Sequence, residues 1–200
     1  MPKEKFDILV TSCVPLPFEN VDTDQIIPAR YLSATSREGF GDNLFRDWRY
    51  KKTGEKNGDF VLNNQKFSGK VLVAGKNFGS GSSREHAVWA IFDYGFRAVV
   101  SSFFADIFMG NCLNNGLLPI VISEELLKKL LTLIEKNPDT MVNIDLDKQT
   151  FTIIATGDSV KFGINPYKKE CLLKGLDDID FLLSMKDIIT GYESNKNLAI

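Results

Sequence analysis

The stretch Lys70–Gly95 reads KVLVAGKNFGSGSSREHAVWAIFDYG and contains the elements that decide the fold. The apolar run at residues 71–74 is typical of a buried strand, and the near-continuous apolar character of residues 85–94 predicts a largely buried helix that ends at Gly95. A glycine-rich turn joins them. Because residues 97–102 predict another buried strand, the pattern indicates a right-handed parallel crossover at the centre of an α/β domain.

The turn before the helix, Gly79-Ser80-Gly81-Ser82-Ser83, is rich in hydrogen-bond donors and is followed by Arg84. We expect Ser82 at the helix cap, with Glu85 three residues later completing a capping box. A helix start is positively polarised, and the glycines, serines and arginine bring many donors around one point, so we expect the turn to bind a carboxylate. The alternative is that Ser82 only caps the helix while Arg84 faces solvent.

The rest of the sequence predicts further elements around this crossover. Strands are predicted at residues 6–14 (ended by Pro15 and Pro17), 59–63 and 117–122 and in a hairpin of 142–146 with 151–155, and helices at 104–114 and at 123–136, capped by Ser123. Residues 21–28 predict a loop that leads into a short extended segment. The tail from Pro166 predicts two or three short helices with stops at Gly175 and Gly191.

Size and composition favour one compact domain over residues 1–200, with a long loop at about residues 30–56 that is either functional or mobile. The formal net charge is only -2, and the basic residues are spread along the chain, so nucleic-acid binding has little electrostatic support. No apolar run reaches the length of a membrane span or of a signal-peptide core. We therefore expect a cytoplasmic protein that binds neither membranes nor nucleic acid.

The three cysteines, Cys13, Cys112 and Cys171, are odd in number and far apart. This spacing argues against a disulfide framework and offers no Cys-x-x-Cys metal motif, so we expect buried, inert thiols. With one histidine and no carboxylate cluster motif, the chain predicts no metal site of its own.

Common phosphate-binding and nucleophile motifs do not fit the turn. The dinucleotide pattern would place Arg84 where a small residue must let helix and strand approach, and the phosphate-loop pattern lacks its Gly-Lys-Ser/Thr ending. The single histidine, His86, lies beside buried residues, so we expect it to pack within the fold and not to complete a serine–histidine site. Positive charge from the helix start and Arg84 would instead stabilise a serine alkoxide. The residues thus indicate a site that holds and deprotonates an acid but lacks its own electrophile.

The triplet Asp22-Thr23-Asp24 carries two carboxylates at alternate positions. In an extended chain they would face the same way. The alternative is a turn in which an aspartate side chain hydrogen-bonds the backbone.

Four blocks, in this order, resemble the signature blocks of the 3-isopropylmalate dehydratase small-subunit family, which is related to the swivel domain of aconitases. They are NVDTDQIIPARYL at residues 20–32, GFG at 39–41 with LFRDWR at 44–49, NFGSGSSREHA at 77–87, and FADIF at 104–108. The resemblance covers nearly the whole chain and is weakest after about Pro138. It implies a swivelling β/β/α three-layer α/β domain, as in the aconitase C-terminal domain. Ser80 departs from the family's usual cysteine, and Gln25 stands in place of a histidine.

The resemblance implies isomerisation of 2-isopropylmalate to 3-isopropylmalate by dehydration and rehydration through isopropylmaleate, in leucine biosynthesis. It also accounts for the missing electrophile. The large subunit of a heterodimer would hold a 4Fe-4S cluster whose open iron acts as a Lewis acid on the small dicarboxylate substrate. This chain would bind no cofactor itself.

The resemblance also implies roles for single residues. Ser82 matches the serine that takes a proton from carbon, and Ser83 and Arg84 match the pair that binds a substrate carboxylate. The further residues expected to contact the substrate are Arg30, Tyr31, Leu32, Ser33 and Arg37, and those expected to support the site are Asp24, Gly81, Glu85 and His86.

The segment Tyr31-Leu32-Ser33-Ala34 matches the part of the loop that selects the substrate side group in related enzymes. Small Ser33 and Ala34 would leave room for an isopropyl group, whereas an arginine there would favour a further carboxylate. Two alternatives remain: a related dehydratase of the citraconate/2-methylmalate or homoaconitate type, and a non-catalytic dicarboxylate-binding subunit.

Overall fold

The computed structural model describes residues 4–32 and 39–196 of the chain and builds them around a sheet with the strand order β4-β3-β2-β1-β5-β6-β7. The strands are β1 (Ile8–Leu16), β2 (Val71–Ala74), β3 (Ala98–Ser101), β4 (Leu118–Val121), β5 (Met141–Asp145), β6 (Thr150–Ile153) and β7 (Ser159–Lys161). The α-helices are α1 (Thr23–Ile26), α2 (Arg46–Arg49), α3 (Glu85–Tyr94), α4 (Asp106–Asn114), α5 (Glu124–Lys136), α6 (Pro166–Lys174), α7 (Asp178–Ser184) and α8 (Lys186–Lys196). Three 3₁₀ turns are η1 (Ala29–Tyr31), η2 (Phe40–Asn43) and η3 (Val61–Asn63).

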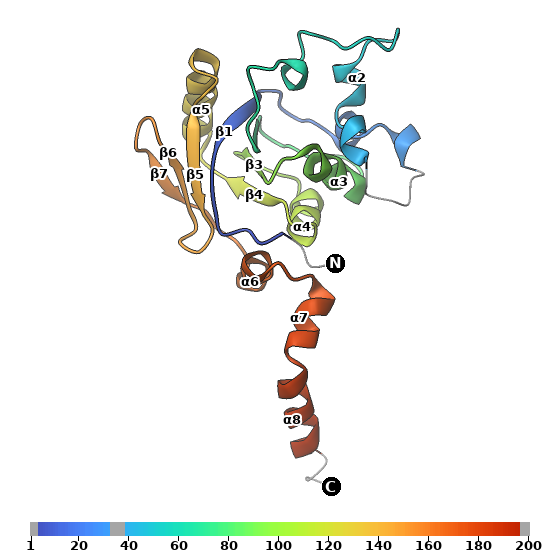
Figure 1. Cartoon of the computed structure of the whole chain (residues 1–200), viewed down its shortest axis with the longest axis vertical. Coiled ribbons are helices and arrows are strands. Elements are labelled where there is room, and N and C mark those ends of the chain that lie inside the picture. Colours follow the sequence, from blue (N-terminus) through green and yellow to red (C-terminus); the bar gives the residue numbers. More distant parts are fainter. Residues whose placement is uncertain (1–3, 33–38, 197–200) are drawn as a thin grey trace.

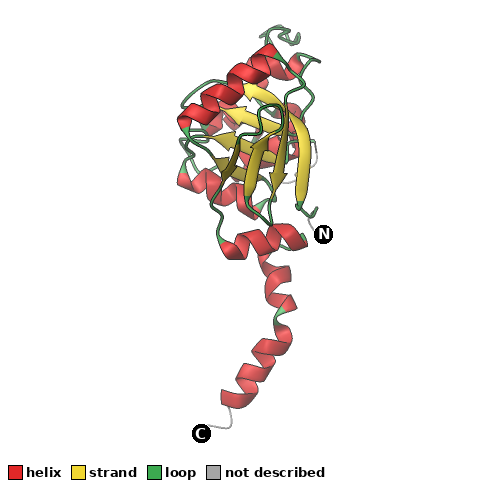
Figure 2. Cartoon of the chain, turned by 90° about the vertical axis from the view of Figure 1, so that its left-hand side faces the viewer, coloured by secondary structure: helices red, strands yellow, loops and turns green. Residues whose placement is uncertain are grey.

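Strand β1 divides the sheet into two halves. It pairs parallel with β2 and antiparallel with β5, so β1 to β4 form a parallel half and β5 to β7 an antiparallel half. The sheet curls at β1, and one apolar cluster joins the two halves, with Val73 and Val100 on one side and Ile144 and Phe151 on the other (Figures 1 and 2). Helices α3 and α4 pack on the opposite face of the parallel half. These layers confirm the predicted β/β/α architecture.

The central crossover follows directly from its sequence. Every residue of β2 is buried, because a parallel strand covered on both faces needs apolar side chains in both directions. Val71 and Val73 enter the cluster shared with the antiparallel half, whereas Leu72 and Ala74 enter the cluster under α3. The predicted bounds of α3 are confirmed, with Gly95 in the left-handed conformation at its end.

Strand β1 continues past the predicted boundary at Pro15 and ends at Leu16. The pairing between β1 and β5 ends at Ser12, so β2 is the one partner of β1 at Pro15. The carbonyl of Leu16 faces β2 and accepts the N–H of Gly75 at 3.0 Å, which places the missing N–H of Pro15 on the other side. Proline therefore removes no ladder bond here.

Other predicted elements also differ from the observed ones. Residues 21–28, predicted as a loop that leads into a short extended segment, contain α1, and residues 59–63, predicted as a strand, contain η3. The side-chain amide of Asn63 donates to the carbonyls of Arg49 (2.6 Å) and Asn57 (2.8 Å), so local bonds replace a sheet ladder there. Gly191 lies inside α8 instead of ending a helix, and β7 was not predicted. The hairpin of β5 with β6 and the Ser123 cap of α5 are confirmed.

The loop predicted at about residues 30–56 contains η1, η2 and α2 in its described part. Arg49 is buried there, and its Nη1 donates to the carbonyls of Gly41 (3.2 Å), Asp42 (3.3 Å) and Leu44 (3.3 Å). A charged side chain thus provides hydrogen-bond donors for backbone carbonyls in a segment with little regular structure. The predicted mobility of this loop stays a prediction.

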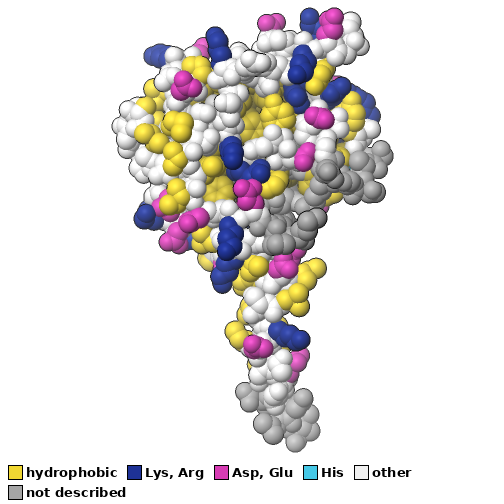
Figure 3. Space-filling model, in the orientation of Figure 1, with side chains coloured by type: hydrophobic (Ala, Val, Ile, Leu, Met, Phe, Trp, Pro, Cys, Tyr) yellow, Lys and Arg dark blue, Asp and Glu magenta, His cyan; other side chains and the backbone are white. Residues whose placement is uncertain are grey.

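Helices α7 and α8 extend away from the sheet as an arm (Figures 1 and 2) and carry exposed apolar side chains (Figure 3), including Ile179, Leu182 and Ile188. Within residues 4–32 and 39–196, no helix has the length and apolar character needed to cross a membrane.

Candidate active site

Three loops meet beyond the carboxyl ends of the parallel strands β1, β2 and β3. Two isolated parallel bridges join them: Asp22, after β1, pairs with Ser80, and Phe78, after β2, pairs with Phe104, after β3. The carboxyl edge of a parallel sheet is where α/β proteins bind their ligands. The glycine- and serine-rich turn is the middle one of the three loops.

Backbone hydrogen bonds hold this turn in place. The carbonyl of Val21 accepts the N–H groups of Gly79 (2.8 Å) and Ser80 (3.3 Å), and the carbonyl of Ser80 accepts the N–H of Thr23 (2.9 Å). The buried hydroxyl of Thr23 donates to the carbonyl of Ser82 at 2.9 Å. These hydrogen bonds tie the turn to the loop after β1, although Thr23 and Ser82 are 59 residues apart in the sequence.

The predicted capping box at Ser82 is wrong. Helix α3 begins at Glu85, its cap residue is Arg84, and no side chain caps it. The carbonyl of Ser82 accepts the N–H of Arg84 at 2.9 Å, and the side chains of Ser82 and Ser83 are exposed. The left-handed Gly81, with φ of 90°, redirects the chain just before these serines. The hydroxyls therefore stand before the helix start and not over its first N–H groups.

A cleft of about 250 Å³ lies in front of the turn. Its lining residues are Thr23, Gly79, Gly81, Ser82, Ser83, Arg84, Ala105, Asp106, Ile107, Phe108 and Asn111. One side is formed by the serines and arginine before α3, and the other by the first two turns of α4. Since both helices begin at this cleft, both contribute a positively polarised end to it. The arrangement suits an anionic ligand.

Arg84 is held toward Asp24, the second residue of α1. Its Nη1 donates to a carboxylate oxygen of Asp24, and the arginine side chain is 17% exposed against 55% for the aspartate. The extended reading of residues 22–24, with both carboxylates on one side, is wrong. Asp22 instead accepts the N–H of Gln25 at 2.8 Å, and the Gln25 side chain accepts the N–H of Asp22 at 2.9 Å. The turn alternative is confirmed, and it points Asp24 at Arg84.

Two further residues predicted to support the site lie at the start of α3. Glu85 accepts a hydrogen bond from Asn115 Nδ2 at 2.8 Å, and the buried Asn115 accepts one from Trp89 Nε1 at 3.0 Å. These bonds join α3 to the end of α4. The ring of His86 packs 4.5 Å from that of Trp89 and 5.5 Å from that of Phe40, as expected of a packing residue. Both residues thus hold α3 in its position beside the cleft.

The loop residues predicted to contact substrate are not in the cleft lining. Arg30 pairs with Asp47, with Nη1 3.0 Å from Oδ2, and the guanidinium lowers the pKa of that carboxyl. Tyr31 and Leu32 are half-buried against the main core. Ser33, Ala34 and Arg37 lie outside the described residues. The structure therefore brings together Asp24 with the turn from Gly81 to Arg84, and it places Arg30 outside the cleft lining, in another hollow beside Arg46 and Asp47.

Glycine at position 79 is required by a close approach. Its φ is 78°, and a Cβ there would lie 2.2 Å from Cγ of Phe108. We predict that Gly79→Ala lowers the free energy of unfolding by about 2–4 kcal/mol, because backbone strain and overpacking add. Chemical denaturation measures this loss.

Gly54→Ala is the matched control for Gly79→Ala. Gly54 has a similar φ of 87° but has no atom within 4 Å of an added Cβ. Only the backbone strain of about 1 kcal/mol should remain. Equal losses in the two variants would show that the contact with Phe108 is not what requires glycine at position 79.

The cysteines are placed as expected and do not suit a cluster. Cys13 in β1, Cys112 in α4 and Cys171 in α6 are all buried on separate elements. Burial raises the pKa of the Cys13 thiol to about 12 and also raises that of Cys112, whereas cluster ligands must be thiolates. In residues 4–32 and 39–196 no three histidine, cysteine or acidic side chains are grouped closely enough to hold a metal ion.

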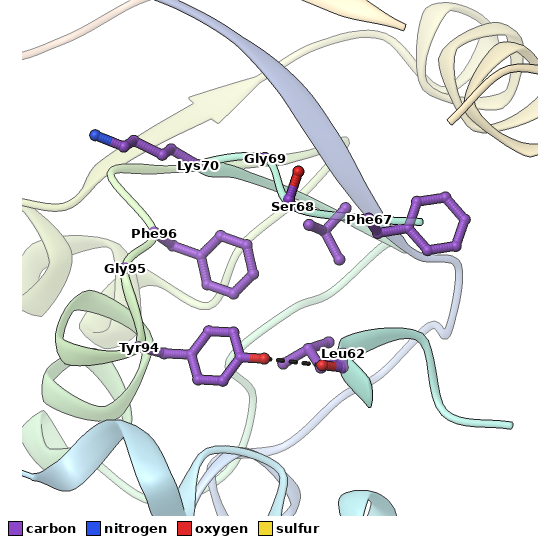
Figure 4. A pocket seen from close by; sticks show the side chains of 9 residues that line it. Leu62, Phe67, Ser68, Gly69, Lys70, Tyr94, Gly95 and Phe96 are labelled. Atoms are coloured by element: carbon purple, nitrogen blue, oxygen red, sulfur yellow. Dashed lines mark hydrogen bonds between the residues drawn. The ribbon is translucent and has the colours of Figure 1, made fainter. Parts of the chain in front are cut away.

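A larger cavity, of about 340 Å³, lies at the opposite end of β2 between Leu62, Phe67, Tyr94 and Phe96 (Figure 4). The Tyr94 hydroxyl already donates to the carbonyl of Leu62 at 2.9 Å, and the Lys70 side chain points away from the two aromatic rings. This cavity lacks convergent polar groups, so we assign the site to the smaller cleft.

Sequence reasoning missed part of the cleft. It assigned no role to Thr23, Ile107, Phe108 or Asn111, although the block FADIF was noted as a motif. The available signal was the position of this block just after a predicted parallel strand, where ligand sites are common.

The chain is similar to known proteins along nearly its whole length. The family described as "Aconitase C-terminal domain" matches residues 3–125. A 3-isopropylmalate dehydratase small subunit of Christiangramia forsetii is 58% identical over 96% of this chain and 94% of its own length, and one of Azobacteroides pseudotrichonymphae is 58% identical over 96% and 98%. The crystal structure of 3-isopropylmalate dehydratase (leuD) from Methanocaldococcus jannaschii matches with a TM-score of 0.67 at 31% identity, over 92% of this chain and 99% of that one.

Proposed function

Because this chain belongs to the family of 3-isopropylmalate dehydratase small subunits, we propose that the cleft before α3 and α4 is its half of the active site. The chain is the small subunit of a hydro-lyase of leucine biosynthesis, as the resemblance predicted. The observation that carries the proposal for the site is the exposed pair Ser82 and Ser83 beside the tethered Arg84, at the mouth of a cleft where two helices begin. Its ligand is a small dicarboxylate.

In this proposal Arg84 binds one carboxylate of the substrate. A guanidinium has five N–H donors, so the bond to Asp24 leaves others for a ligand. Ser83, exposed beside it, donates a further hydrogen bond. The two residues orient the carbon next to the carboxylate toward Ser82, because the three side chains line the same side of one cleft.

Ser82 acts as the base on that carbon. Its Oγ takes the proton as the substrate loses hydroxide, which yields the unsaturated dicarboxylate isopropylmaleate, and it returns the proton when water adds back with the opposite regiochemistry. A serine works as a base only as an alkoxide, and the nearby guanidinium and the polarised helix ends favour the negative oxygen.

The remaining chemistry belongs to a partner. The cysteines of this chain do not fit an iron–sulfur cluster, and we propose that a large subunit would hold a 4Fe-4S cluster, which would supply a Lewis acid for the leaving hydroxyl. The substrate would lie between the two subunits of a heterodimer in the cytoplasm. The chain would then close on the large subunit as one swivelling domain, and this closure would bring the loop at about residues 30–56, whose described residues are not part of the cleft lining, toward the substrate.

Co-expression with the large subunit of the same organism tests this proposal. We expect a brown complex that converts 2-isopropylmalate to 3-isopropylmalate and shows the ultraviolet absorbance of isopropylmaleate, whereas the isolated chain has no turnover. Calorimetry on the isolated chain should give no tight isopropylmalate binding, because half of the site is missing. Tight binding without a partner would favour a non-catalytic binding subunit, and a colourless, unassociated mixture would contradict the assignment.

A further inference from the structure

We propose that Ile107 forms the apolar wall of the cleft and contacts the alkyl side group of the substrate, opposite the carboxylate site at Arg84. This inference rests on the proposed function and extends it to a specificity-determining residue. It follows from the juxtaposition of one exposed apolar side chain with the serines and arginine in a single cleft.

Ile107 is the second residue of α4, and its side chain is 58% exposed. Of the residues that the structure describes, it is the one large apolar side chain that is both exposed and part of the cleft lining. A ligand in the cleft would cover this surface and remove it from water.

Packing beneath Ile107 fixes its position. The next residue, Phe108, is buried, and its ring lies 5.4 Å from that of Phe78 and 6.2 Å from that of Phe104. The side chain of Phe108 also occupies the space that a Cβ on Gly79 would need. The first turn of α4 is thus locked against the turn that carries the serines, so the two sides of the cleft keep their spacing.

The cleft therefore has two chemically different sides. Ser82, Ser83 and Arg84 present hydroxyls and a positive charge, whereas Ile107 and Ala105 present hydrocarbon. A ligand that satisfies both sides carries a carboxylate and, apart from it, an apolar group. Among the described residues of the loop predicted to select the side group, Tyr31 and Leu32 are not in this lining, whereas Ile107 is. Ser33 and Ala34 lie outside the described residues.

Unreactive substrate analogues test the contact in the reconstituted two-subunit enzyme. We would measure competitive inhibition by 2-isopropylsuccinate and by methylsuccinate, which share both carboxylates and differ only in the alkyl group. Ile107→Ala should weaken inhibition by the isopropyl compound about tenfold and inhibition by the methyl compound less than about threefold. The difference is expected because the isopropyl group has two more carbons than the methyl group, and these carbons would lose their contact with the isoleucine. Ile107→Leu should restore most of the discrimination.

Phe103→Ala is the matched control. Phe103 is 50% exposed and lies four residues earlier in the same chain segment, but it is not in the cleft lining. It should leave both inhibition constants unchanged. An equal loss for the two analogues, no loss for either, or weakened subunit association in Ile107→Ala would overturn the inference. A wild-type complex without turnover would instead contradict the proposed function, so the two failures are distinguishable.

Discussion

Replacing Ser82 by alanine should lower turnover of the reconstituted dehydratase about 10³-fold, because the group that moves the proton to and from carbon is lost. The KM for isopropylmalate should change little, since Arg84 and Ser83 still bind the carboxylate. The exposed side chain of Ser82 makes no structural contribution that alanine would remove, because its carbonyl, not its hydroxyl, accepts the bonds from Thr23 and Arg84. Steady-state kinetics, with cluster absorbance and gel filtration as checks on assembly, measure the effect.

Ser80→Ala is the matched control for this experiment. Ser80 belongs to the same turn, but it bonds Val21 and Thr23 through its backbone and is not in the cleft lining. Its removal should leave turnover within about twofold, as is usual for a side chain outside the chemistry. If Ser82→Ala retains near-normal turnover in an assembled complex, Ser82 is not the base.

Replacing Arg84 by lysine should lower kcat/KM about 10²- to 10³-fold, with much of the change in KM. A lysine keeps the charge but cannot bond Asp24 and a substrate carboxylate in one planar arrangement. Asp24→Asn should cause a smaller loss, because the arginine stays but loses its tether. The combined variant should lose less than the product of the two single losses, since both act on the same guanidinium.

Arg97→Lys is the matched control, because it shows what the replacement of a paired arginine by lysine does outside the cleft. Arg97 is also partly buried, at 24% exposure, and also pairs with an acidic residue, Glu4 at 2.8 Å, but it lies outside the cleft lining. Its kinetic constants should match those of the wild type. Wild-type KM and kcat in Arg84→Lys would show that the substrate carboxylate is bound elsewhere, and Arg30 would then be the next arginine to test.

Local patterns predicted those elements whose environment they describe. The apolar run of β2 was found within its observed bounds because a strand covered on both faces must be apolar throughout. Helix α3 was found because its buried residues, Ala87, Val88, Ala90 and Ile91, form an apolar run that ends at a glycine. The Ser123 cap was found because Ser123 does bond the N–H of Leu126. Ser82 failed the same test, although its sequence pattern is equally good. At Ser82 the backbone carbonyl accepts hydrogen bonds from the Thr23 hydroxyl and the Arg84 N–H. The bond from Thr23 comes from a distant part of the chain, which a local capping pattern does not include.

By itself the sequence determined the parallel crossover, the kinds of groups on the turn and the family of the chain, because these depend on residues close together or on motifs in order. Only the tertiary structure decided which groups share the cleft. Parallel pairing brings the ends of β1, β2 and β3 to one edge, so Asp24 meets Arg84 and the first turn of α4 faces Ser82. Gly79 lets that turn approach because it has no Cβ to meet Phe108, and Ile107 is thereby placed across from the serines. Such long-range contacts are set by sheet register and packing, which a local pattern of residue types does not contain.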